Sequence, residues 1–183
     1  GKYHYMFGER LLVAPIYQDK LENEVRLPKG KWRYWFDDTE LIEGPTTFKQ
    51  KFPLEEYPVF IKEGAIVPMH IKRAYTRIGK PEDEGYLTFL IYPDLEEANF
   101  EVFREKDKST VLTYKKLGKK LEVEISGKRI PHILNIKSQN KPSNITLDGR
   151  LLLEEVDYNY NTETKKLQIK TSSYRDGLYL INF

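Results

Sequence analysis

The stretch Tyr57-Pro58-Val59-Phe60-Ile61-Lys62-Glu63-Gly64-Ala65-Ile66-Val67-Pro68-Met69 decides how this chain folds. Two short apolar runs flank Lys62-Glu63-Gly64. Proline has no N–H for a sheet ladder and biases the residue before it toward extended backbone, so Pro58 and Pro68 suit the ends of strands. Gly64 gives the backbone freedom that a tight turn needs. The stretch therefore predicts a buried strand, a turn and a second strand.

Alternation of apolar and polar residues extends this β pattern toward the N-terminus. Residues 24–28 place Val25 and Leu27 on one face, and residues 31–36 place Trp32, Tyr34 and Phe36 on one face, with Arg33 and Trp35 opposite. A period of two is typical of half-buried strands. Because Lys29-Gly30 lies between the two segments, we predict a turn there and a hairpin around it.

The second half of the chain shows strand patterns throughout. Strand signals recur about every 8–12 residues, which is the spacing of antiparallel sandwiches, and no segment keeps a helical period of 3.6 over three turns. Hairpins are predicted around residues 115–120 and 161–164, and residues 151–156 are predicted as a strand. The breakers and charges of residues 79–85 suggest a domain boundary. The predicted fold is all-β, with two tandem antiparallel β-sandwich domains at residues 1–78 and 79–183.

Composition narrows the class of partner. The 183 residues include 39% apolar and 13% aromatic residues, enough for a hydrophobic core. Thirty basic and 28 acidic residues give a formal charge of +2, so neither nucleic acid nor a membrane surface is an expected partner. The chain has no cysteine, which excludes disulfides and thiolate chemistry. Neither a secreted nor a cytoplasmic location is indicated by these features.

Three stretches in order resemble the segments that follow the catalytic barrel in glycoside hydrolase family 31, the α-glucosidase and α-xylosidase family. They are residues 5–16 (YMFGERLLVAPI), residues 25–35 (VRLPKGKWRYW) and residues 53–69 (PLEEYPVFIKEGAIVPM). Residues 86–149 resemble the family's distal β-domain more loosely, and residues 105–110 lack the acidic, glycine-containing motif found there. The resemblance implies the C-terminal β-domains of such an enzyme, with its own catalytic barrel as partner.

The same resemblance implies that catalysis belongs to a part of the protein outside these residues. Family 31 enzymes are retaining glycosidases, whose two carboxyl groups lie about 5 Å apart in a pocket. In the family both come from the barrel, and no position here matches their motifs. Acidic pairs such as Asp37-Asp38 and Glu55-Glu56 are expected to be solvated charges, because neighbours in a strand point to opposite faces. No catalytic residue, cofactor site or metal site is predicted, since His4, His70 and His132 lack a metal-binding spacing.

Two functions of different class are compatible with the sequence. In the first, the two domains buttress a glycosidase barrel, are not catalytic alone, and present an apolar patch where the barrel docks. In the alternative, the distal domain is a carbohydrate-binding module for α-glucan-type oligosaccharides, which stack on exposed aromatic rings. The candidate sugar-contact residues are Trp35, Tyr158, Tyr160 and Tyr174. A self-sufficient hydrolase is a third hypothesis, for which the sequence offers no carboxylate pair.

Overall fold

A computed structural model describes residues 3–18, 20, 22–70, 81–103, 109–128, 130–171 and 177–183. Within these residues the chain is all-β, as predicted, with one short 3₁₀ turn at Pro81–Asp83. It divides into two compact units, residues 1–65 and 66–183, and each unit is described by itself below. No helix in the described residues is long and apolar enough to cross a membrane.

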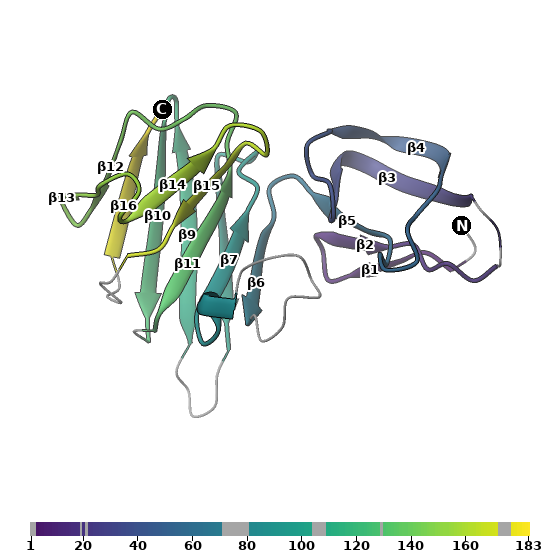
Figure 1. Cartoon of the computed structure of the whole chain (residues 1–183), viewed down its shortest axis with the longest axis horizontal. Coiled ribbons are helices and arrows are strands. Elements are labelled where there is room, and N and C mark those ends of the chain that lie inside the picture. Colours follow the sequence, from purple (N-terminus) through teal and green to yellow (C-terminus); the bar gives the residue numbers. More distant parts are fainter. Residues whose placement is uncertain are drawn as a thin grey trace. The chain divides into compact units, whose positions relative to one another are not determined.

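The first unit is one five-stranded sheet with the strand order β1-β2-β5-β3-β4 (Figure 1). All its strand pairs are antiparallel, and the long strands β3 and β4 bend over β1, β2 and β5. The strands are β1 Tyr5–Phe7, β2 Leu11–Val13, β3 Asn23–Tyr34, β4 Ile42–Gln50 and β5 Val59–Lys62. In this unit a single sheet, folded over its own core, forms the predicted sandwich.

The predicted hairpin at Lys29-Gly30 is wrong. The strand β3 runs on through these residues and pairs with β4 on both sides of a register shift between Leu27 and Gly30. Gly30 has a φ of 139° and lies opposite Gly44, whose missing side chain leaves room for the carbonyl oxygen of Pro28. The glycines at this point therefore allow a bulge and a bend of one strand, and no chain reversal follows.

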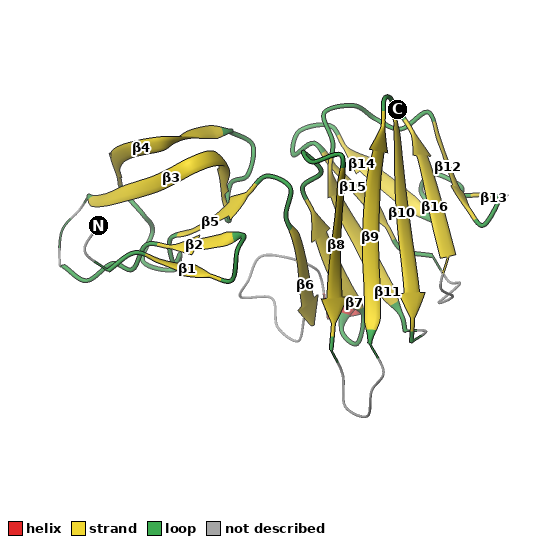
Figure 2. Ribbon diagram, turned by 180° about the vertical axis from the view of Figure 1, so that it is seen from behind, coloured by secondary structure: helices red, strands yellow, loops and turns green. Residues whose placement is uncertain are grey.

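The second unit is a sandwich of two sheets (Figure 2). One sheet has the order β13-β12-β16-β10-β9-β8 and the other the order β14-β15-β11-β7-β6. One pair, β7 with β11, is parallel, which departs from the purely antiparallel prediction. The strands are β6 Ile66–His70, β7 Leu87–Ile91, β8 Glu97–Val102, β9 Thr110–Leu117, β10 Lys120–Gly127, β11 His132–Lys137, β12 Asn144–Leu147, β13 Arg150–Leu151, β14 Tyr158–Asn161, β15 Lys166–Ile169 and β16 Gly177–Asn182.

Two of the local predictions for this unit are confirmed and one is wrong. Hairpins join β9 to β10 and β14 to β15, as the turn signals indicated. The predicted strand 151–156 ends at Leu151, because the backbone turns and the N–H of Asp157 donates to the carbonyl of Leu153. The Asp157 carboxylate accepts the N–H of Leu153 in return and fixes this turn.

The strand β6 belongs to the second unit. It pairs with β7 from Ile66 to His70, and Ile66 contributes to the second unit's core. The first domain predicted from the sequence, residues 1–78, includes these residues, and its predicted boundary between residues 78 and 79 lies outside the described residues. In the structure the change of unit falls between Ala65 and Ile66.

Each unit has its own hydrophobic core. The first core packs Trp32, Tyr34 and Phe60, and Phe36 lies against it, which confirms the predicted inner face of residues 31–36. The second core includes Phe89, Tyr114 and Tyr179 from facing sheets.

Candidate functional site

The strand registers of the first unit build an apolar face on the side of the sheet opposite the core. Two rows cross β1, β2, β5 and the end of β3, and together they are called the docking face below. The first row is Tyr5, Val13, Val59 and Trp35, and the second is Phe7, Leu11, Ile61 and Arg33. Because side chains alternate along a strand, their neighbours Leu12, Phe60 and Tyr34 point into the core.

The exposure of the docking face rises toward one edge. Ile61 is 1% exposed, whereas Tyr5 is 48% and Phe7 is 67% exposed. The exposed residues lie on β1, which is an edge strand of the sheet. A sheet edge carrying large apolar side chains is a surface that proteins ordinarily cover.

The one charged residue of the docking face, Arg33, is buried and paired. Its Nε donates to the carboxylate of Glu63, and its Nη1 donates to the carbonyl oxygens of Asp38 at 2.9 Å and Thr39 at 3.1 Å. A buried guanidinium is tolerated when its N–H groups and charge are met in this way. Arg33 therefore fixes the turn after β5 and the loop after β3 behind the apolar face.

Tyr57 extends the docking face beside Tyr5. Burial raises the pKa of the Tyr57 hydroxyl, and the neighbouring Tyr5, with which it shares a hydrogen bond, raises that pKa further. Leu54, in the preceding loop, is almost fully exposed. An apolar patch on this domain is among the predictions made from the sequence, but the strand β1 is not, although Tyr3, Tyr5 and Phe7 alternate with other residues as in a strand.

The candidate sugar-contact residues differ in their settings. Trp35 is half-buried in the first row of the docking face. Tyr158 is 7% exposed and belongs to the core of the second unit, so its ring faces are not available for stacking. Tyr160 is partly buried, and its hydroxyl donates to the carbonyl oxygens of Ser138 and Gln139. Tyr174 lies outside the described residues.

Several acidic residues have partners in the structure. Asp37 accepts from the backbone and side chain of Thr39, and Glu56 accepts from the Tyr34 hydroxyl at 2.7 Å. The carboxylate of Asp83 forms an ion pair with Nζ of Lys170, also at 2.7 Å. These contacts tie loops to strands.

The histidines also differ in setting. His132 is buried, and its Nδ1 lies 3.1 Å from the carbonyl oxygen of Ile130, which can only accept. Nδ1 therefore carries the proton, and Nε2 accepts from the Tyr179 hydroxyl at 2.7 Å. Within the described residues, no group of three or more potential metal ligands occurs.

Comparison with known proteins assigns the first unit. Residues 2–67 match the model of the glycosyl hydrolase family 31 C-terminal domain. An isomaltosyltransferase from Sporosarcina globispora is 29% identical over 94% of this chain and 16% of its own length. An α-glucosidase from Saccharolobus solfataricus is 39% identical over 36% of this chain and 9% of its own length.

The fold of the whole chain also has a solved relative. A cycloalternan-forming enzyme from Listeria monocytogenes, solved with a pentasaccharide substrate, matches 98% of this chain and 18% of its own chain, with a TM-score of 0.81 and 24% identity. The chain thus spans about a sixth or less of the length of the two sequence relatives. The match to glycosyl hydrolase family 31 thus covers the first unit and the start of β6.

Proposed function

We propose that this chain supplies accessory β-domains to a larger family 31 enzyme, and that the docking face packs against the catalytic barrel of that enzyme. The observation that carries the proposal is the apolar edge of the first unit. Three consecutive residues of β1, Tyr5 to Phe7, are exposed, and the exposed Tyr57 shares a hydrogen bond with Tyr5. Covering such a surface stabilises a protein by about 25 cal/mol for each Å² of apolar area removed from water.

The chemistry of the described residues agrees with an accessory role. A retaining glycosidase needs two carboxyl groups that converge across a pocket. In this chain Asp83 and Glu63 are held in ion pairs, and Glu56 is held by a tyrosine hydroxyl. We propose that the chain alone has no hydrolytic activity.

For the whole enzyme, we propose only the chemical class of the bond on which it acts. The relatives carry the names isomaltosyltransferase, α-glucosidase and α-xylosidase. We therefore propose hydrolysis or transfer at an α-glucosidic or α-xylosidic bond, performed by residues of the barrel.

The docking face is tested by two polar substitutions on β1, Tyr5→Ser together with Phe7→Ser. In the longer protein that includes the barrel, we expect the double variant to lower the thermal midpoint by several degrees and to reduce activity on α-glucosides. In the chain alone, whose docking face is uncovered, the same substitutions should lower self-association and binding of a hydrophobic dye. Sedimentation velocity and dye fluorescence measure these two effects.

The control variant is Leu117→Ser, which removes an exposed apolar residue from the β9–β10 hairpin of the second unit. It should change neither the activity of the longer protein nor the dye signal. The proposal fails if the β1 variant leaves the longer protein as stable and active as the control does. The accessory role is contradicted if the chain alone hydrolyses an α-glucoside and the β1 substitutions do not abolish that hydrolysis.

A further inference from the structure

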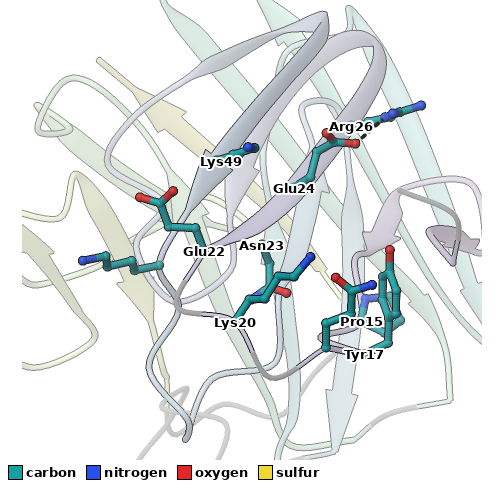
Figure 3. A pocket seen from close by; sticks show the side chains of 10 residues that line it. Pro15, Tyr17, Lys20, Glu22, Asn23, Glu24, Arg26 and Lys49 are labelled. Carbon is teal, nitrogen blue, oxygen red and sulfur yellow. Dashed lines mark hydrogen bonds and ion pairs between the residues drawn. The ribbon is translucent and has the colours of Figure 1, made fainter.

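The first unit contains an open pocket of about 930 Å³ that shares no residue with the docking face (Figure 3). Pockets of this size accommodate small ligands of a few rings. Polar side chains and one aromatic ring line it. They are Pro15, Tyr17, Gln18, Lys20, Glu22, Asn23, Glu24, Arg26, Lys49 and Lys51.

Strand pairing makes one wall of this pocket. Glu24 of β3 lies directly opposite Lys49 of β4, and both point away from the core because their neighbour Val25 is buried. Glu24 accepts from the Nε of Arg26 at 2.8 Å. The backbone N–H of Arg26 donates to Nδ1 of His4 at 3.4 Å. The wall therefore offers a carboxylate and a guanidinium side by side.

The segment after β2 contributes the aromatic side chain that lines the pocket, Tyr17. Tyr17 is 51% exposed, and the ring of Tyr3 contacts it edge-on with centroids 4.6 Å apart. Pro15 lines the pocket near this ring. An edge-on neighbour holds a tyrosine ring in place and leaves a ring face for a ligand with an apolar surface.

The lining combines hydrogen-bond donors and acceptors over a small area. The amides of Gln18 and Asn23 offer both, the lysines and Arg26 offer donors, and Glu22 and Glu24 offer acceptors. A simple anion would be attracted by the lysines and repelled by the two carboxylates. A chain of sugar rings uses the whole set, because its hydroxyls both donate and accept and its C–H faces stack on an aromatic ring.

We infer that this pocket is a non-catalytic site for a neutral oligosaccharide, with Tyr17 as the stacking platform and the Glu24–Arg26 pair as the hydroxyl-binding group. The inference rests on the proposed function, which makes an α-linked oligosaccharide the substrate of the whole enzyme. It differs from the sequence-based alternative, which placed a binding module in the distal domain. By holding a substrate chain away from the barrel, the site raises its local concentration near the enzyme.

The test is isothermal titration of the whole chain with maltotriose, isomaltotriose and inorganic phosphate. We expect saturable binding of at least one trisaccharide with a dissociation constant in the millimolar range, or about 4 kcal/mol. Tyr17→Ala and Glu24→Gln should each weaken that binding by about tenfold or more. The matched controls are Phe103→Ala, an exposed aromatic residue of the second unit, and Glu124→Gln, an exposed acid on β10. Both should bind as the wild type does.

Three results overturn the inference. One is a flat titration with both trisaccharides, the second is binding of phosphate alone, and the third is trisaccharide binding that the pocket variants do not weaken. None of these results affects the docking face, because its test uses substitutions on β1 and a readout of stability. If the β1 variant fails the docking test and the chain still binds a trisaccharide, the docking proposal is wrong and the binding site is retained.

Discussion

Arg33 shows how a single buried charge organises the first unit. The side chains of Arg33 and Glu63 are 7% and 10% exposed, so their ion pair is shielded from water. Burying a charge away from water is unfavourable. Removing its partner leaves the other charge buried and uncompensated, which lowers the free energy of unfolding.

We therefore expect Glu63→Ala to lower the free energy of unfolding of the first unit by about 3 kcal/mol. Urea denaturation followed by tryptophan fluorescence measures this change. The matched control is Glu24→Ala, which removes the partner of Arg26 in an exposed pair and should leave the free energy of unfolding little changed. Equal effects of the two variants would show that the Arg33 pair contributes no more than a surface contact.

Tyr179 is a second residue whose setting predicts a measurable effect. Burial raises the pKa of its hydroxyl to about 12, from the ordinary value of 10. The folded state therefore favours the neutral phenol. The contribution of the protonated Tyr179 hydroxyl to stability is complete below pH 10 and is lost as the pH rises from 10 toward 12. The loss is on the order of 2–3 kcal/mol for a shift of this size.

Tyr179→Phe should make stability less dependent on pH between 10 and 12. At neutral pH it should cost about 1–2 kcal/mol, because Nε2 of His132 is left buried without the Tyr179 hydroxyl that it accepts from. Denaturant titrations of both proteins at pH 7, 10 and 11 measure the two effects. A variant that keeps the full alkaline loss of stability would assign that loss to other tyrosines or lysines.

At the scale of the element, the two ends of β10 depend on glycine in different ways: Gly118 lies in the turn before it, and Gly127 is its last residue. Gly118 and Gly127 both have positive φ, at 62° and 94°. A Cβ at Gly118 would meet open space, whereas a Cβ at Gly127 would overlap the backbone carbonyl oxygen of Ser109.

Gly127→Ala should therefore destabilise the second unit by more than about 2 kcal/mol, since backbone strain and a clash with another backbone segment add together. Gly118→Ala is the matched control and should cost about 1 kcal/mol, from the positive φ alone. The midpoints of urea denaturation measured by circular dichroism compare the two. Similar midpoints would mean that β9 and β10 separate at their ends without cost.

The strands themselves were predictable where one face is buried. The alternation of Trp32, Tyr34 and Phe36 fixed the inner face of β3 because a one-residue slip would bury Arg33 and Trp35 in the core instead. Gly30 misled the prediction, since glycine permits a turn and a bulge alike and the choice depends on Gly44 across the sheet. Pairing partners distant in sequence, such as the parallel β7 and β11, leave no local pattern.

For the candidate sites too, local sequence predicts some features, and others depend on strand pairing and packing. An apolar patch on the first domain is expected from the hypothesis that a barrel docks there, but its position depends on the register of β1, β2 and β5. Tyr158 carries no sign of burial in its local sequence, because its neighbours Asp157 and Asn159 are polar. Its burial results from packing between the two sheets of the sandwich.

For the molecule as a whole, the separate cores predict separate unfolding transitions. Both tryptophans, Trp32 and Trp35, lie in the first unit, so tryptophan fluorescence reports that unit while circular dichroism reports both. Phe89→Ala in the second core should cost about 3–5 kcal/mol and shift the circular dichroism transition.

The fluorescence midpoint should stay where it is in the wild type. The corresponding first-core variant, Phe60→Ala, should reverse the pattern by moving the fluorescence midpoint. One transition that shifts equally in both probes for both variants would show that the two units unfold together.

The short connection between β5 and β6 has a consequence for how such genes recombine. Glu63, Gly64 and Ala65 separate the last strand of one unit from the first strand of the next. A crossover at the breaker-rich residues 79–85, where the sequence suggests a joint, would give a daughter protein a sandwich without its edge strand and leave β7 uncovered. Modular exchange of the distal unit among related enzymes must therefore cut within these three residues, or carry both units together.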